Sequence, residues 1–278
     1  MIKHLAITAL VDNRSEDQRL LTEHGLSLWI EADGRHILFD TGQSDYFLHN
    51  AETLGINPRD ADTLVISHGH YDHTGGVVAL LKVNPTPRIY CHPGIFIPRY
   101  SRQADGNMKP IGLSRTTADA LHRRVDTIHW VSRPLFLTKN IGVTGPIPRV
   151  AAFEDTGGAF FLDPGGKRPD MVEDDVAMWF STAGGLVVVT GCCHSGIVNT
   201  IAYISSITGA NPVASVIGGL HLLHASAERI EATCDYLQSS GVGKIVPFHC
   251  TGEEAVAHFE RRFGEAVVKK GGVGKIVI

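Results

Sequence analysis

The stretch Leu64–Gly76, LVISHGHYDHTGG, decides the fold of this chain. Its first residues form a short apolar run, which is typical of a buried strand. Four side chains that bind metals in proteins follow within six residues: His68, His70, Asp72 and His73. In an extended turn His68 and His70 point to the same side, because side chains alternate along such a chain. Asp72 and His73 open the next helix and can turn toward a second ion.

The chemistry of these residue types indicates a metal site at the end of the strand. Zn²⁺ favours imidazole nitrogen and carboxylate oxygen, and a catalytic zinc ion keeps one position for water. Two ions a few Å apart can hold a hydroxide at neutral pH. The alternative is a polar loop with incidental histidines, but the glycines after the motif permit a tight approach of the backbone. We therefore expect one or two ions, Zn²⁺ first, with Mn and Fe as alternatives.

The stretch resembles the signature of the metallo-β-lactamase superfamily, a strand followed by His-x-His-x-Asp-His. Three other segments are similar to superfamily motifs: ILFDTG (37–42), LVVVTGCCHSG (186–196) and KIVPFHC (244–250). More narrowly, SHGHYDHTGG, GCCHSGIVNT, VIGGLHL and PFHCTG together resemble the class II metal-dependent hydrolases. That branch often carries the name 7,8-dihydropterin-6-yl-methyl-4-(ribofuranosyl)aminobenzene-5′-phosphate synthase. A fold and a metal site do not fix the substrate, however.

The resemblance implies a set of metal ligands and a supporting carboxylate. His194 is implied to join His68 and His70 at the first ion, and the alternative for His194 is a contact with substrate or with a ligand. Asp40 is implied to contact the metal ligands without binding the metal itself. The implied metal ligands are His68, His70, Asp72, His73, His194 and His249.

Cys192 departs from the superfamily pattern, because the bridging Asp of the family falls at this position. A thiolate can bind Zn²⁺, and a period of two places Cys192 and His194 on one side of the chain. The alternative is a cysteine that only packs. We expect the second case, with the second ion held by Asp72, His73, His249 and water, and therefore more weakly than the first.

Two further residues are candidates for contacts with the substrate. His221 follows the strand VASVIGG, and we expect it to donate a proton to the leaving group, while Asp72 orients the nucleophile. A structural histidine at a strand end is the alternative for His221. Arg149 lies where a lid would cover the site, and an arginine there can bind phosphate or carboxylate. A surface salt bridge is the alternative for Arg149.

The order of elements predicts an α/β protein. Two similar halves, residues 1–94 and 176–278, carry strands inside and helices outside, which predicts a four-layer αββα sandwich. Residues 95–175 hold most of the prolines and few periodic runs, so we expect an insertion or cap beside the active site. The resemblance implies that this cap is an α+β, ferredoxin-like unit.

Composition excludes several classes of protein. The chain has 278 residues, with 25 Lys and Arg against 29 Asp and Glu, and this charge of -4 argues against a nucleic-acid partner. No apolar run approaches the roughly 20 residues of a membrane helix. Five cysteines, an odd number, do not suggest a disulfide framework, so we expect a reduced, cytoplasmic protein. We expect a small-molecule substrate, with phosphorylated molecules among the candidates, and a homodimer stays open.

These observations predict a binuclear, Zn²⁺-dependent hydrolase of an ester or phosphoester of a small molecule. A pterin-related condensing synthase is one alternative, although no phosphate-binding loop of known type is visible. A non-enzymatic protein that binds metal or ligand through a degenerate site is another, because the bridging Asp is missing.

Overall fold

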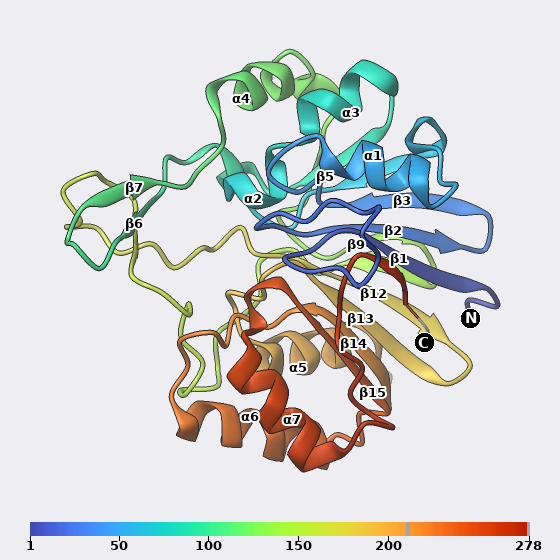
Figure 1. Ribbon diagram of the computed structural model, residues 1–278, viewed down its shortest axis with the longest axis vertical. Helices are drawn as coiled ribbons and strands as arrows, with labels where there is room; N and C mark the ends of the chain where they lie inside the picture. Colours follow the sequence, from blue (N-terminus) through green and yellow to red (C-terminus); the bar gives the residue numbers. More distant parts are fainter. Residues whose placement is uncertain (210–211, 277–278) are drawn as a thin grey trace.

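Two β-sheets packed face to face form the centre of the computed structural model, which describes residues 1–209 and 212–276 (Figure 1). The first sheet has the order β16 (Gly274–Ile276), β1 (Leu5–Val11), β2 (Ser27–Ala32), β3 (Arg35–Phe39), β4 (Thr63–Val65), β5 (Arg88–Cys91) and β8 (His129–Trp130). The second has the order β15 (Lys244–Phe248), β14 (Val213–Gly219), β13 (Gly185–Thr190), β12 (Ala177–Thr182), β10 (Ile141–Val143) and β9 (Leu135–Thr138).

Helices cover the outer face of each sheet and complete four layers (Figure 1). The first sheet carries α1 (Tyr46–Thr53), α2 (Tyr71–Thr74), α3 (Val77–Val83) and α4 (Arg115–His122). The second carries α5 (Ile197–Thr208), α6 (Ala227–Ser239) and α7 (Glu253–Phe263). The predicted αββα sandwich is therefore confirmed. None of the helices within the described ranges is long and apolar enough to cross a membrane.

The alternation of side chains explains why each sheet buries both faces. In β2, Leu28 and Ile30 face the other sheet, whereas Trp29 faces the helices. In β13, Val187 packs between the sheets and Val188 packs against α5 and α6. Successive strand residues point to opposite faces, so an uninterrupted apolar run marks a strand that is buried on both sides.

The segment 95–175 does not form the single α+β cap that we expected. Its β8 extends the first sheet, and its β9 and β10 extend the second. Ile141 and Val143 bury their side chains between the two sheets, which accounts for this pairing. The boundaries at residues 95 and 175, and the ferredoxin-like form of the insertion, are therefore wrong.

The rest of that segment contains a separate three-stranded sheet, which we call the small sheet. It consists of β11 (Phe160–Phe161), β6 (Tyr100–Arg102) and β7 (Met108–Pro110). Figure 1 shows β6 and β7 projecting from one end of the sandwich. This is the part of the expected cap that lies beside the site described next.

Candidate metal centre

The candidate site residues come together at the carboxyl ends of the central strands. Asp40 follows β3 and His68 follows β4, two parallel neighbours in the first sheet. Cys192, His221 and His249 follow β13, β14 and β15, which are parallel neighbours in the second. Asp40, His221 and His249 all have positive φ angles of 47° to 60°. Backbone strain of this kind clusters at functional sites.

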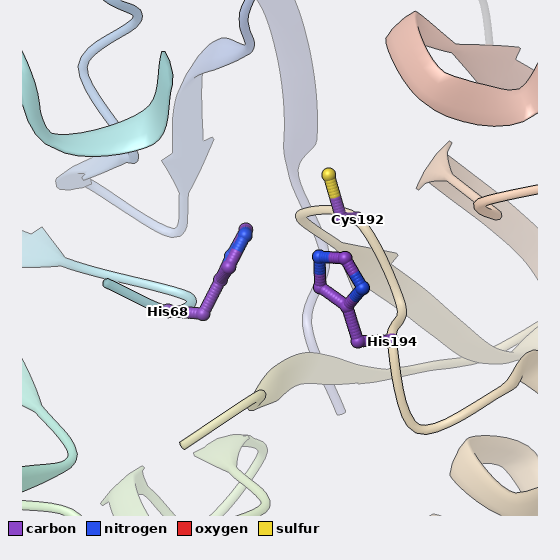
Figure 2. A group of neighbouring side chains, drawn as sticks. All are labelled: His68, Cys192 and His194. Atoms are coloured by element: carbon purple, nitrogen blue, oxygen red, sulfur yellow. The ribbon is translucent and has the colours of Figure 1, made fainter. Parts of the chain in front are cut away.

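Three buried imidazoles form the first half of the centre. His68 Nε2 lies 3.0 Å from His70 Nδ1, and the ring of His194 lies 4.8 Å from the ring of His68. Figure 2 shows His68 and His194 reaching toward each other from opposite sides, with Cys192 beside them. The Nδ1 of His194 donates to the carbonyl of Thr156 at 2.8 Å, which leaves the lone pair on Nε2. That Nε2 is buried and has no hydrogen-bond partner in the described part of the chain.

The second half combines a carboxylate, a thiol and two imidazoles. His249 Nε2 lies 3.2 Å from Asp72 Oδ2, and His73 Nε2 lies 3.8 Å from the same oxygen. Cys192 Sγ lies 3.1 Å from His73 Nε2. His249 Nδ1 is 2.8 Å from the side-chain oxygen Oδ1 of Asn13 and donates to it, so Nε2 faces the centre. A divalent cation fits this set of donors, since imidazole, thiolate and carboxylate are all zinc ligands.

Asp40 orients two of these ligands at once. Its Oδ2 accepts from His73 Nδ1 at 2.7 Å and from Ser67 Oγ at 2.6 Å. Ser67 Oγ lies 2.9 Å from His68 Nδ1 and accepts from it. Both imidazoles therefore carry their proton on Nδ1 and present Nε2 to the centre. Such outer partners position metal ligands and raise their basicity. Asp40 has the supporting position that the resemblance implied.

The electrostatics of the site favour the forms that bind metals. Burial lowers the pKa values of His68, His70 and His194 well below the usual value, so these rings are neutral. Burial opposes ionisation of Asp72, but the charge of His73 outweighs it and holds the pKa of this carboxyl well below its usual range. Burial also opposes protonation of His73, yet the charges of Asp40 and Asp72 raise its pKa to about 9. In the absence of metal, His73 thus holds the proton that a cation would displace.

Arg149 occupies a different place from the one we expected. Its Nη1 donates to the carbonyl of His194 at 2.7 Å, and its Nη2 donates to the carbonyl of Met171 at 2.5 Å. It lines a separate pocket, together with His92 and Ser195. The guanidinium therefore holds the loop that carries His194 through a hydrogen bond to its backbone. The expected contact with a substrate phosphate has no support in this arrangement.

A cavity of about 390 Å³ opens in front of the metal centre. His221 lies on its wall, with its ring 4.2 Å from the ring of His194. The small sheet supplies the opposite side, where the Phe160 ring lies 5.3 Å from His70 and 5.2 Å from His194. Asp72 is the only carboxylate among the described residues that line this cavity.

Sequence reasoning missed several residues that the structure brings to the site. His24 is not among the predicted site residues, yet its Nε2 lies 3.2 Å from Asp72 Oδ2. His24 lies in the loop between β1 and β2, far from every motif, so no local signal marks it. Cys250 was not singled out either, although it directly follows His249 and lines the same cavity.

Known proteins share this fold and most of this chain. A family model described as the metallo-β-lactamase superfamily matches residues 22–203. A 7,8-dihydropterin-6-methyl-4-(β-D-ribofuranosyl)-aminobenzene-5′-phosphate synthase of Methanocaldococcus jannaschii is 36% identical over 258 residues, covering 88% of this chain and 86% of that protein. An uncharacterised protein of the same archaeon is 32% identical over 273 residues, covering 98% and 99%.

A solved structure extends this likeness to three dimensions. The crystal structure of a metal-dependent hydrolase of the β-lactamase superfamily is 33% identical and covers 99% of both chains, with a TM-score of 0.83. Because the family model, the relatives and the αββα sandwich all agree, this chain belongs to the metallo-β-lactamase superfamily.

Proposed function

We propose that this protein is a binuclear, Zn²⁺-dependent hydrolase that cleaves an ester or phosphoester of a small, anionic molecule. The observation that carries the proposal is the convergence of two sets of zinc-binding side chains beside one cavity, which His70, Asp72 and His249 line. The first ion would be held by His68, His70 and His194, and the second by Asp72, His73 and His249. Two such ions supply a nucleophile from water at neutral pH and stabilise charge that develops on the substrate oxygen.

The unpartnered Nε2 of His194 argues against a degenerate site. A buried polar atom without a partner costs about 1–3 kcal/mol, and such atoms are rare in folded proteins. Asp40 and Thr156 accept the Nδ1 protons of His73 and His194, which directs the remaining lone pairs to the centre. A non-enzymatic protein with a decayed site has no need of this orientation.

The charges on the cavity wall favour an anionic substrate. Arg102 and Lys109 of the small sheet are exposed and line the cavity opposite the metal centre. The guanidinium carbon of Arg102 lies 4.4 Å above the ring of Phe161, and Lys109 Nζ lies 3.2 Å from Tyr71 Oη. Arginine and lysine bind phosphate and carboxylate groups. Phosphorylated small molecules are therefore the first class of substrate to test.

His221 is our candidate for the group that protonates the leaving oxygen. It lines the cavity, and its Nδ1 is buried without a partner among the described residues. General acids of this type contribute about 10²- to 10⁴-fold to a rate. The apolar side chains of Phe160, Ile111 and Leu223 line the same cavity and offer a surface for the body of the substrate.

A pterin-related synthase is the second candidate, and one observation favours it. The 36% identical relative of Methanocaldococcus jannaschii carries the name of such a synthase and aligns over 88% of this chain. A condensing reaction with a phosphorylated reactant would use the same cavity and the same cationic side chains.

The test is hydrolysis of bis(p-nitrophenyl) phosphate by the zinc-loaded protein, together with zinc counted per chain. We expect turnover that a chelator abolishes and zinc restores. Asp72→Ala should lose at least about 10²-fold in kcat and about one zinc per chain, because it removes the carboxylate of the second ion. Asp17→Ala, which removes the half-buried partner of the exposed Arg19, is the control and should match the wild type. Full turnover and full zinc content in Asp72→Ala would contradict the proposal.

A further inference from the structure

The sulfur of Cys192 lies between the two halves of the metal centre. Its distance to His73 Nε2 is 3.1 Å. The ligand atoms of His68, Cys192 and His194 all lie within 4.8 Å of one another, and so do those of His73, Cys192 and His249. Within the described ranges, Cys192 is the member that these two sets share.

We propose that Cys192 Sγ is a metal ligand shared by the two ion positions, a role that rests on the binuclear centre proposed above. The sequence favoured a packing role for this cysteine, and the geometry points the other way. Cys192 is only 2% exposed, but its sulfur lies within hydrogen-bond distance of an imidazole nitrogen, His73 Nε2. A sulfur that only fills space would have hydrocarbon around it.

The adjacent residue Cys193 shows what a packing cysteine looks like in this chain. Cys193 belongs to the apolar cluster between the second sheet and its helices, together with Ile197 and Ile201. Its sulfur lies 3.5 Å from the hydroxyl of Thr200. Cys192 belongs to none of the three apolar clusters of the described residues. Two neighbouring cysteines thus face opposite environments, one apolar and one made of ligand atoms.

The backbone around Cys192 is built to bring its sulfur to the centre. Gly191 lies so close to Ser67 that a Cβ there would be 2.1 Å from the Ser67 hydroxyl and 3.0 Å from Asp40 Oδ2. The strand end can therefore approach the pair that orients His68 and His73. Cys193 has a φ of 62°, a conformation that is uncommon for residues other than glycine. This turn lets Cys192 and His194 face the centre while Cys193 faces the core.

A shared sulfur has a chemical consequence for metal choice. A carboxylate reaches two ions with two hard oxygens, whereas a thiolate offers one large, soft atom. Thiolate ligands favour Zn²⁺ and Co²⁺, while oxygen ligands suit Mn²⁺. The thiol proton leaves when the metal binds. We therefore expect this centre to prefer Zn²⁺ and Co²⁺ over Mn²⁺.

Cys250 is the rival source of a sulfur ligand and must be tested in parallel. Its Sγ lies 3.6 Å from the carbonyl of Cys192 and donates to it, and it forms a third cluster with Cys192 and His221. Cys250 is absent from the two sets that Cys192 forms with His68 and His194 and with His73 and His249. The geometry therefore assigns the shared ligand to Cys192 and a neighbouring position to Cys250.

The experiment loads the full chain with Co²⁺ and measures two quantities, cobalt per chain and the sulfur-to-cobalt charge-transfer absorption in the near ultraviolet. We expect two cobalt ions and the absorption band in the wild type. Cys192→Ser should lose the band and about one cobalt per chain. Cys192→Asp should keep two ions, lose the band and bind Mn²⁺ at least about tenfold more tightly than the wild type. Cys193→Ser and Cys250→Ser are the controls and should keep the band.

The possible outcomes separate this inference from the binuclear proposal. A wild type that binds two cobalt ions without the band, or a band that survives in Cys192→Ser, would overturn the inference alone. Loss of the band in Cys250→Ser but not in Cys192→Asp would overturn it in favour of Cys250. A wild type that binds no cobalt would overturn the metal centre itself. If Cys192→Ser does not fold, the comparison of Cys192→Asp with Cys250→Ser decides.

Discussion

Asp40 orients ligands of both proposed metal positions through one carboxylate. It is fully buried, with a φ of 60°, and it accepts hydrogen bonds from His73 and Ser67, while Ser67 in turn accepts from His68. Its Oδ1 also accepts from the backbone N–H of Ser67 at 2.7 Å. An amide in its place offers one acceptor atom instead of two, so it cannot accept from His73 and from both the N–H and the hydroxyl of Ser67. The orientation of the centre therefore depends on a residue that touches no ion.

We predict that Asp40→Asn lowers zinc affinity about 10- to 100-fold, as the loss of an outer partner typically does. Competition of the protein with a chromophoric chelator measures this affinity. Asp33→Asn is a matched control, because Asp33 also has a positive φ, of 46°, but lies in an exposed turn. Equal zinc affinities for Asp40→Asn and the wild type would show that Asp40 does not orient the ligands.

Asp175 makes the stability of the chain depend on pH. Burial, together with the charge of Asp174, raises its pKa to about 6, although the backbone N–H of Ser195 donates to it at 2.7 Å. In the unfolded chain an aspartate ionises near pH 3.9. Between about pH 4 and pH 6, the folded protein holds a proton that the unfolded chain has released. Stability therefore falls as the pH rises through this window and stays lower above it.

We predict that Asp175→Asn removes this dependence, because the amide carries no charge and can still accept from Ser195. Unfolding of the metal-free protein, followed from pH 4 to pH 7, measures the effect. The free energy of unfolding of the variant, relative to that of the wild type, should increase as the pH rises, by roughly 2–3 kcal/mol at pH 7. If the free energy of unfolding changed with pH in the same way in the two proteins, a raised pKa at Asp175 would be ruled out.

At the scale of elements, the small sheet is the part of the molecule that faces both the metal centre and the solvent. Phe160 of β11 packs on the imidazoles, while Arg102 of β6 and Lys109 of β7 line the outer wall of the cavity. One element thus supplies both an apolar surface and two cations. Substrate choice should depend on this sheet, whereas metal binding should not.

We predict that Arg102→Ala and Lys109→Ala each raise KM for an anionic phosphoester about tenfold with little change in kcat, as expected when binding is lost equally in ground and transition state. KM for a neutral acetate ester should stay the same. Lys82→Ala, an exposed cation on α3, is the control. A fall in kcat for both kinds of substrate would instead place these side chains in the chemistry.

The sequence predicted some elements well and others poorly, for physical reasons. The sandwich could be predicted because apolar strands alternate with amphipathic helices. The hydrophobic pattern of each of these elements lies within a short stretch of sequence. The addition of β9 and β10 to the second sheet could not, because these strands have only four and three residues, and β10 joins the sheet by pairing with β12, far along the chain. His24 was missed because its contact with Asp72 joins segments without a shared motif. For Cys192, one spacing fits both ligand and packing roles, and the surroundings of its sulfur, which the sequence does not show, separate them.

At the scale of the whole molecule, the metal centre lies where the two sheets meet. The first sheet supplies Asp40 and the motif that begins at His68, and the second supplies Cys192, His221 and His249. Neither sheet holds a complete set of ligands alone. The packing of the sandwich, about a core that includes Phe39 and Val189, therefore sets the distance between the two halves of the site.

The central claim is that these two halves hold two zinc ions, and anomalous diffraction tests it most directly. Crystals of the zinc-loaded protein should be measured above and below the zinc absorption edge. We predict two anomalous peaks per chain at the cavity floor, one among His68, His70 and His194 and the other among Asp72, His73 and His249. A single peak, or peaks only outside this group of side chains, would contradict the binuclear centre.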